Sequence, residues 1–421
     1  MRAPTRFALL AIVSAALQLS GLVPAHAAAG DLDPSFGDGG IVLSSHVHLA
    51  ITAIAIQPDG SIVAAGIGAK NNIIVARYDS AGTLDPSLGN GGVVRTTFVG
   101  PGSAAAVALA PDGDIVVGGR LLPAQGGPYR FAFARYLPDG SLDPTFSVDG
   151  KTTTGIHGHQ AYLMDATVQP DGGIVAVGYT CCGGTSSDQR FAIVKLLPDG
   201  SLDRSFADDG RRTTPFGSGP SEATAVILED DGRIVVGGAR NDGHGAVAMY
   251  LPNGDLDRTF AGDGRASTRQ RFSASGVAVD PAQDVVLSGT FFGNGNHMGA
   301  VRFGPDGTQD LSFGVDGRAI TDVGPGTQGE GYGLALQDDG GIVVAGDIYS
   351  NEGFVVARWT SDGTYDRGFG QDGLATTTNL TEGQSHDIAI APDRGIVEGG
   401  SALASSSFND QVFALAKFQA A

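Results

Sequence analysis

Two histidine pairs are the first residues whose type and spacing suggest chemistry. His46 and His48, and likewise His157 and His159, are each separated by a single residue. On an extended backbone this spacing turns both imidazole rings to the same side, where they could bind a transition metal. Neither pair has a carboxylate or a third histidine at a fixed spacing. We therefore expect no bound cofactor, with a transition metal as the alternative.

The cysteines of the chain are also neighbours. Cys181 and Cys182 are the only two. Adjacent cysteines close only a strained small ring or stay reduced, so they supply no disulfide framework. Two interpretations stay open: a pair without a role, and a vicinal disulfide or redox-sensitive loop.

Aspartate-rich turns such as 253–257 could in principle bind calcium. A calcium loop needs six or more oxygen ligands and typically a bidentate glutamate, and no turn in this chain supplies that pattern. Aspartate that caps the turn backbone is the simpler explanation, and calcium stays a minor alternative. The chain also lacks the motifs G-x-S-x-G and H-E-x-x-H, a phosphate-binding loop and a dinucleotide fingerprint. No catalytic residue is therefore predicted.

Internal repetition places these residues on structural elements. The phrase Leu-Asp-Pro-Ser-Phe-Gly-Asp-Gly-Gly at 32–40 returns, with substitutions, six more times. Its phenylalanine or leucine anchor stands at positions 36, 88, 146, 206, 260, 313 and 369. The copies start near residues 31, 83, 141, 201, 255, 308 and 364. We therefore expect one domain of seven repeats over 28–421.

Each copy is interpreted as four short β-strands. In the first copy these runs, named a to d, cover 41–45, 50–56, 61–66 and 72–78. Pro-Asp-Gly between runs b and c suits a tight turn, because proline presets φ, aspartate caps the backbone and glycine accepts positive φ. Run c is apolar on both faces, which indicates a strand covered on both sides. The 66 glycines argue against a mainly helical chain.

A four-stranded unit with two apolar faces buries them only by stacking against similar units around an axis. We therefore expect an all-β fold, a seven-bladed β-propeller of four-stranded blades, with an extended β-solenoid as the alternative. The chain begins with an extra phrase and run a, and it ends on a run d at 412–418. Pairing of 39–45 with the blade that holds 385–418 would close the ring and remove both open edges.

The repeated motifs resemble a known family. Leu-Asp-Pro-Ser-Phe-Gly-x-Gly-Gly, Gln-Pro-Asp-Gly-x-Ile-Val-x-x-Gly and Ala-Arg-Tyr-x-x-x-Gly resemble the delta-60 repeat of bacterial secreted and surface proteins, over essentially all of 30–421. Run b, as in 276–280, is similar to the innermost strand of NHL-type propeller blades. That similarity implies the strand order b, c, d and then the next run a, from axis to rim. Leu88, 281–283 and Glu398 depart from the pattern. The resemblance implies no reaction and no catalytic residues.

The first residues have the features of an export signal. Arg2 and Arg6 precede an apolar run at 7–23, and Ala-His-Ala at 25–27 offers a cleavage site. We expect 1–27 to be a secretory signal peptide, with a membrane anchor as the alternative, and the mature chain to be secreted or periplasmic without a transmembrane segment. The net charge of -19, from 45 acidic and 26 basic residues, disfavours nucleic acid as a partner. We expect a monomer.

Strand alternation divides the loops between two faces. The b–c and d–a turns are short and stereotyped, whereas the a–b and c–d loops on the other face vary. Variable loops on a rigid scaffold usually carry binding, so we expect the ligand on this variable-loop face. The histidines and cysteines of the mature chain lie in or beside its loops: His46, His48, His157, His159, His244, His297, His386, Cys181 and Cys182. The aromatic candidates for an exposed patch are Phe98, Tyr129, Phe291, Phe292, Tyr349 and Phe408.

Three functions remain open at this point. The sequence favours a non-enzymatic binding module for a protein, peptide or glycan on the variable-loop face. A hydrolase or lyase at the channel mouth is one alternative, because loop variation can build an enzyme on a propeller. A purely structural module of the cell envelope is the other. Clustered carboxylates or histidines with perturbed pKa values would favour the enzyme, and an exposed aromatic patch would favour binding.

Overall fold

The computed structural model describes residues 28–48, 50–68, 72–182, 185–293, 295–321, 328–348, 353–377, 380–404 and 411–420. Within these ranges the side chains of 45–48, 182 and 185–187 are not described. The expected signal peptide at 1–27 lies outside the described residues, as do Tyr349 and Phe408. Every regular element that the structure describes is a β-strand. In these ranges no helix has the length and apolar character needed to cross a membrane.

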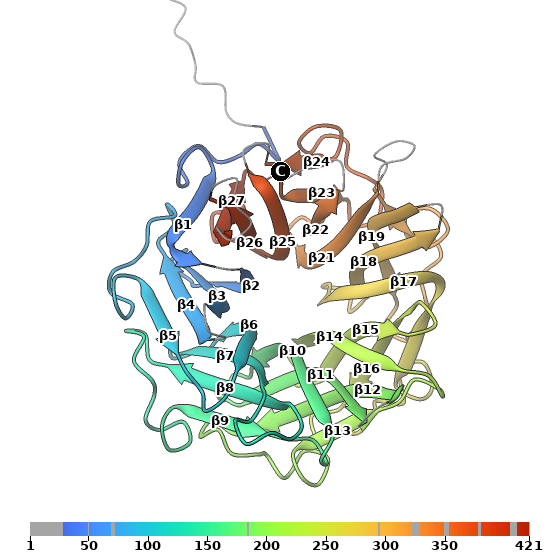
Figure 1. Ribbon diagram of the computed structural model, residues 1–421. Helices are drawn as coiled ribbons and strands as arrows, with labels where there is room; N and C mark the ends of the chain where they lie inside the picture. Colours follow the sequence, from blue (N-terminus) through green and yellow to red (C-terminus); the bar gives the residue numbers. More distant parts are fainter. Residues whose placement is uncertain are drawn as a thin grey trace, which may run out of the picture.

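The described strands form six antiparallel sheets arranged radially around a central opening (Figure 1). Five of these sheets have four strands each. The first sheet contains β2 (Ile51–Ile56), β3 (Ile62–Gly68), β4 (Asn72–Tyr78) and β5 (Val93–Thr96). The second contains β6 (Gly102–Leu109), β7 (Ile115–Leu121), β8 (Arg130–Tyr136) and β9 (Lys151–Thr154). The third contains β10 (Gln160–Val168), β11 (Ile174–Cys182), β12 (Thr185–Leu196) and β13 (Arg211–Thr214). In each of them run b lies nearest the channel and the following run a lies at the rim (Figure 1). This is the strand order that the similarity to NHL-type blades implies.

The other two four-stranded sheets lie where the chain ends meet. One consists of β21 (Gly329–Leu336), β22 (Ile342–Ile348), β23 (Val355–Trp359) and β24 (Leu374–Thr376). The other consists of β25 (Thr381–Ile390), β26 (Ile396–Leu403), β27 (Gln411–Phe418) and β1 (Ile41–His48).

The expectation of seven separate four-stranded blades was wrong, because the described strands form five four-stranded blades and one continuous sheet of seven strands. That sheet contains β14 (Ser221–Leu228), β15 (Ile234–Arg240), β16 (His244–Tyr250), β17 (Arg265–Val279), β18 (Val285–Gly293), β19 (Gly295–Phe303) and β20 (Ala319–Ile320). β17 pairs with β16 through its first half and with β18 through its second half.

The sequence of β17 allows the sheet to be continuous. Its residues 265–275 contain neither glycine nor proline, so no backbone-breaking residue separates run a from run b in this copy. Other copies carry such residues in the same connection, for example Gly155 and Pro215. The strand can therefore run on from one pairing partner to the next, but the absence of these residues does not require it, because the connections at 45–50 and 377–380 also lack them and join separate strands.

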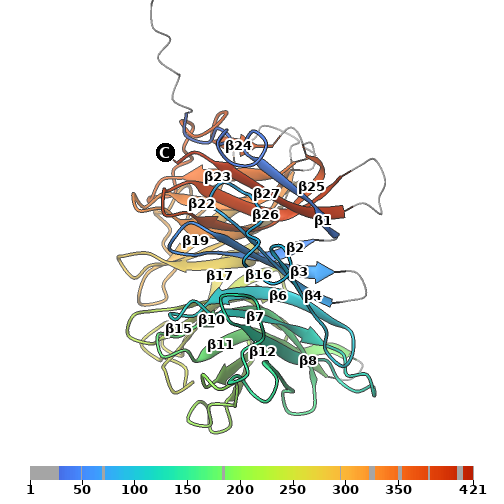
Figure 2. The ribbon, with the colours of Figure 1, turned by 90° about the vertical axis from the view of Figure 1, so that its left-hand side faces the viewer.

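The N-terminal strand closes the ring, as the sequence predicts. β1 pairs antiparallel with β27, with Ile41 opposite Ala416 and Leu43 opposite Ala414. β1 takes the outer position, in the order β1-β27-β26-β25, and Figure 2 shows β1 and β27 side by side. Both strands gain backbone hydrogen bonds that would otherwise be missing at an open sheet edge.

The repeated phrase holds neighbouring sheets together on the face of the b–c turns. Its anchor is fully buried, as Phe36 illustrates in the first copy. Its aspartate accepts a hydrogen bond from a cation on run d: Arg77 Nε donates to Asp85 Oδ2 at 2.7 Å. Arg77 Nη1 also donates to the carbonyl oxygen of Pro138 in the following copy, at 2.7 Å. Each such arginine therefore joins two consecutive copies.

Candidate functional site at the channel mouth

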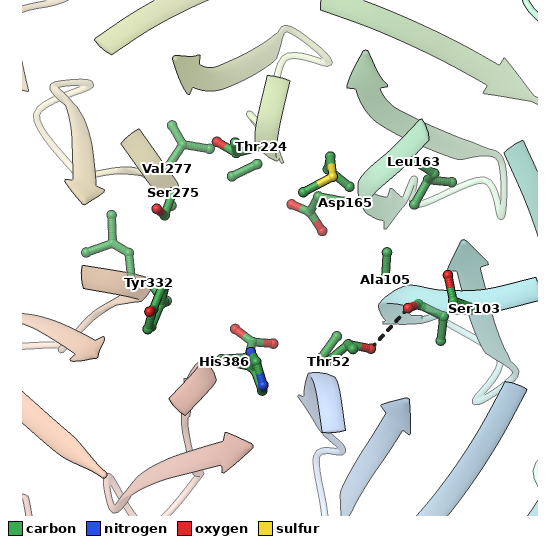
Figure 3. Close-up of a pocket in the computed structure, with 18 of the residues that line it drawn as sticks. Thr52, Ser103, Ala105, Leu163, Asp165, Thr224, Ser275, Val277, Tyr332 and His386 are labelled. Atoms are coloured by element: carbon green, nitrogen blue, oxygen red, sulfur yellow. Dashed lines mark hydrogen bonds between the residues drawn. The ribbon is translucent and has the colours of Figure 1, made fainter. Parts of the chain in front are cut away.

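A bulge in the innermost strand of each copy directs side chains into the central channel. In β2 the register with β3 shifts between Ile51 and Ala53, which leaves Thr52 as the extra residue. A bulge of this kind bends the strand and re-aims the extra side chain. The residues at the corresponding shifts are Ala105, Met164, Thr224, Ser275, Tyr332 and His386. Together with Thr52 they line one cavity of about 500 Å³, around which Figure 3 shows several of them arranged.

The cavity occupies the part of the channel next to the variable loops. Ile67 and Arg120 also line it. Both residues lie near the C-terminal ends of their strands, β3 and β7, where the c–d loops begin. The structure therefore places a concave site on the face where the sequence predicts the ligand.

Two aspartates directly follow a bulge and face this cavity. Asp165 Oδ2 accepts the backbone N–H of Val226 at 2.8 Å, and Asp387 Oδ2 accepts that of Ile54 at 2.8 Å. Each carboxyl group thus links the inner strands of two neighbouring copies. Burial raises the pKa of Asp165 to about 6. Burial raises the pKa of Asp387 to about 7, and the charge of Asp165 adds to that effect. Both groups can therefore exchange a proton near neutral pH.

Two threonines at bulge positions make a similar connection with hydroxyl groups. Thr224 Oγ1 donates to the carbonyl oxygen of Ala274 on the next inner strand, at 3.1 Å. Thr52 Oγ1 lies 3.3 Å from the carbonyl oxygen of Ala104. The polar residues of the channel wall therefore have a structural role, which is to hold the inner strands in a ring, in addition to any role toward a ligand.

A further acidic group lies between the copies that contain β21 and β25. Asp347 Oδ1 accepts the backbone N–H of Ser385 at 3.0 Å, and Tyr332 Oη donates to Glu330 Oε2 at 3.2 Å. Burial raises the pKa of Asp347 to about 6. Glu398 is fully buried, and its carboxyl oxygens make no hydrogen bond of normal geometry to a described residue, although the Ser385 hydroxyl and the backbone N–H of Val355 lie close by. Burial raises the pKa of Glu398 well above its usual range, and the charge of Asp347 adds to this.

Three tyrosines stack beside the cavity on the variable-loop face. The ring centroids of Tyr129 and Tyr162 are 5.0 Å apart, and those of Tyr162 and Tyr179 are 4.9 Å apart. The second pair is nearly parallel, with 19° between the ring planes. The guanidinium carbon of Arg120 lies 5.9 Å from the centroid of Tyr129 and 5.7 Å from that of Tyr162. Because Arg120 also lines the cavity, the tyrosine stack and the channel mouth form one continuous surface.

Of the three tyrosines, the sequence analysis identified only Tyr129. Tyr162 and Tyr179 lie inside β10 and β11, and neither was among the aromatic candidates. A signal does exist in the repeats. Tyr162 stands two residues before the bulge, where two other copies have Ser103 and Glu222, both polar. An aromatic residue at a position that is otherwise polar indicates a surface rather than a core contact.

The histidine candidates do not meet at one site. His157 Nε2 lies 3.2 Å from Asp209 Oδ2, and His244 Nδ1 lies 2.8 Å from the carbonyl oxygen of Thr268. His297 is half-buried in β19. The side chains of His46 and His48 lie outside the description, and His159 is half-buried beside His157. Among the described residues, no group of three or more histidine, cysteine or acidic side chains is arranged to hold a metal ion.

Of the two adjacent phenylalanine candidates, one is buried and the other is exposed. Phe291 is not a surface residue, because it is only 5% exposed and packs on Phe272 with centroids 4.6 Å apart. Phe292, next to it, is 39% exposed. Cys181 is half-buried in β11, but the side chain of Cys182 is not described, so both interpretations of the cysteine pair stay open. Alternation along β18 explains the two phenylalanines, because successive residues of a strand point to opposite faces.

The radial sheets around a central channel define this chain as a β-propeller. Five of its segments, 57–88, 110–146, 169–206, 229–260 and 337–369, match the family described as a domain of unknown function (DUF5122) beta-propeller. The narrower delta-60 and NHL resemblance stays a prediction. No curated protein matches the sequence.

Two solved structures show the same fold. The polysaccharide lyase Uly1 is 13% identical, with a TM-score of 0.54 over 92% of this chain and 92% of its own. The periplasmic gluconolactonase PpgL of Pseudomonas aeruginosa is 14% identical, with a TM-score of 0.51 over 86% of this chain and 99% of its own. At this level of identity the likeness extends to the fold alone.

Proposed function

We propose that this chain is an exported, non-enzymatic propeller that binds a glycan at the channel mouth. The observation that carries the proposal is the stack of Tyr129, Tyr162 and Tyr179, which shares Arg120 with the central cavity. Aromatic side chains bury apolar area while a polar group stays in reach of water or ligand. A sugar ring suits such a surface, because its C–H face covers an aromatic ring while its hydroxyl groups form hydrogen bonds.

The lining of the cavity favours a glycan over a peptide. The cavity offers hydroxyl and carboxyl groups from Thr52, Thr224, Ser275, Asp165 and Asp387, which can bind the hydroxyl groups of a sugar. A peptide typically anchors itself by a large side chain that fills a well-packed, fully desolvated pocket. The residues around this cavity are mostly small or polar, so they supply little of that kind of contact.

A glycan array followed by titration calorimetry tests the proposal. Replacement of the central ring, Tyr162→Ala, is expected to weaken binding of the array hits at least about fivefold. Tyr162→Phe keeps the stack and should bind within about twofold of the wild type. Val148→Ala, at an exposed residue of a repeated phrase, is the matched control. The absence of any glycan hit, or a Tyr162→Ala variant that binds like the wild type, would overturn the proposal.

A hydrolase or lyase is the second candidate, and Asp165 with Asp387 favours it. Both carboxyl groups face the cavity, and their pKa values are raised to about 6 and about 7. Groups of this kind can act as general acid or base near neutral pH. This candidate predicts that the protein turns over the glycans that it binds. Asp165→Asn and Asp387→Asn should each abolish that turnover. Turnover that survives both substitutions, or no turnover at all, would exclude this candidate.

The export part of the proposal depends on residues 1–27 and not on the fold. N-terminal sequencing of the protein recovered from the periplasm or the medium of a bacterial culture tests it. A mature chain that begins at Ala28 is the expected result, and retention of the full chain in the cytoplasm would contradict it.

A further inference from the structure

A second cleft, on the variable-loop face, carries a more specific inference about the ligand. It has a volume of about 440 Å³ and is lined by residues of β14, β15, β17 and β18. These strands belong to the seven-stranded sheet, in which β17 passes from one pairing partner to the next. The side chains that give the cleft its chemistry are Ser221, Glu222, Arg240, Arg271 and Phe292.

Arg271 supplies a positive charge that no acidic side chain among the described residues neutralises in an ion pair. Its side chain is exposed, and it has no ion-pair partner among the described residues. The guanidinium group lies over Gly243, because a Cβ atom built on that glycine would be 3.0 Å from Arg271 Nε. Arg240, by contrast, already has two partners: it donates to Asp242 at 2.5 Å and to Ser267 at 3.2 Å. Arg271 is therefore the cation that is available to a ligand.

The wall of the cleft contains a hydroxyl group without a partner. Ser221 is 2% exposed, and its Oγ has no hydrogen-bond partner among the described residues. Buried polar side chains are normally hydrogen-bonded, so such an atom indicates a partner that the protein does not provide. Phe292 adds an exposed aromatic ring to the same cleft.

Glu222 connects this cleft with the tyrosine stack. Glu222 lines the cleft. Burial raises the pKa of Tyr179, and the negative charge of Glu222 raises it further. The strands that carry these two residues, β14 and β11, pack against each other in consecutive copies, so Glu222 lies near Tyr179. A ligand long enough to cover both would cross from the stack to Arg271 without leaving the protein surface.

We propose that this cleft is an acid-specific subsite for the same glycan, and that it binds a sugar carrying a carboxylate or sulfate group. The acidic group pairs with Arg271, the sugar ring covers Phe292, and sugar hydroxyl groups bond to Ser221 and Glu222. This inference rests on the proposed glycan-binding function. Because the chain as a whole carries a charge of -19, an acidic group is repelled elsewhere and attracted here, which fixes the register of the bound polymer.

Oligogalacturonate and its methyl ester form a matched pair of probes, because esterification removes the charge and keeps the sugar. Titration calorimetry with the full mature chain is expected to show about tenfold tighter binding of the acid form. Arg271→Ala should remove that preference by weakening binding of the acid form. Phe292→Ala should weaken both forms. Arg394→Ala, an exposed arginine on a b–c turn, is the charge-matched control and should change neither.

The outcomes separate this inference from the proposed function. Equal binding of both forms, or a preference that Arg271→Ala retains, overturns the subsite while glycan binding stands. Loss of all glycan binding overturns both. Chondroitin sulfate and poly-glutamate complete the set of probes. Binding of chondroitin sulfate that Arg271→Ala weakens supports the subsite, whereas binding of poly-glutamate through Arg271 that is tighter than binding of either glycan overturns the assignment to a glycan.

Discussion

Lys417, in the last strand, reaches Asp33, in the first copy of the repeated phrase, with 3.5 Å between Nζ and Oδ2. The backbone N–H of Asp33 also donates to the carbonyl oxygen of Lys417 at 2.8 Å. The two ends of the described chain are thus joined by an ion pair between a run d cation and a phrase aspartate. Arg77 and Asp85 form the same kind of ion pair between copies that are consecutive in the sequence. The lysine side chain is only 6% exposed, so the pair is almost fully buried.

We predict that Lys417→Met destabilises the protein by about 3 kcal/mol, because it leaves a nearly buried aspartate without its cation. The measurement is the free energy of unfolding by urea titration. The fourth copy supplies a natural comparison, because Met249 stands at the position that corresponds to Lys417. There Arg233 takes the place of the run d cation, with its Nη1 3.8 Å from Asp257. Gly395 corresponds to Arg233, so the double variant Lys417→Met/Gly395→Arg should recover much of the loss. A double variant less stable than the single one would contradict the prediction.

The raised pKa of Asp387 predicts a loss of stability as the pH rises. Above about pH 4 the unfolded chain has released this proton, whereas the folded chain keeps it until about pH 7. The folded state binds more protons in this window, so the free energy of unfolding falls as the pH rises through it. Asp387→Asn should make the slope shallower, by up to about 1.4 kcal/mol per pH unit.

Urea titrations at several pH values between 4.5 and 7.5 measure that slope. Asp208→Asn, at an exposed turn residue, is the control and should leave the slope unchanged. An Asp387→Asn variant with the slope of the wild type would show that the carboxyl group is ionised throughout the window.

Glu398 is a position where a substitution should stabilise the fold. Its equivalents on run c in other copies include Val117, Val236 and Val344, which are buried and apolar. A buried carboxyl group without hydrogen bonds of normal geometry costs free energy that an apolar residue of similar size avoids. Glu398→Val is expected to raise the free energy of unfolding by about 1 to 4 kcal/mol. Thermal and urea unfolding measure this, and a destabilised variant would indicate a partner for Glu398 in the native protein.

The continuous strand β17 gives a prediction about the shape of the sheet. Gly or Pro would restore the interruption that other copies have, so Gln270→Gly should loosen the joint between the two halves without unfolding either. Hydrogen exchange of the amides in 265–279 is the readout. Faster exchange confined to residues near 270 is expected, and unchanged exchange would show that pairing with β16 and β18 alone fixes this strand.

Local patterns predicted much of the architecture. The repeated phrase and the Pro-Asp-Gly turns recur along the chain, and such short-range signals fix strands and turns without knowledge of the rest of the fold. The spare run a at the beginning of the sequence predicted the pairing of Ile41 with the last sheet. The same counting failed for the fifth copy, because the number of repeats does not tell whether a run a and the next run b are separate strands.

The candidate site could be predicted only in part. The sequence placed the ligand on the face of the variable loops and included Tyr129 and Phe292 among its candidates. It missed Tyr162, Tyr179 and Arg120, because a strand residue cannot be assigned to core or channel until the register is known. A bulge shifts that register by one residue, and nothing in a single sequence marks where the shift falls.

The sequence by itself determined the all-β repeated fold and the closure by the N-terminal strand, because these follow from signals within one copy and from counting the copies, whereas the strand order within a copy was implied by the family resemblance. Only the tertiary structure decided that β17 is continuous, and that Arg120 meets a tyrosine stack formed by its own copy and the next. It also placed Arg271 and Phe292 in one cleft. These contacts join residues that are distant in the chain, and they depend on how bulged strands pack around an axis rather than on any local pattern.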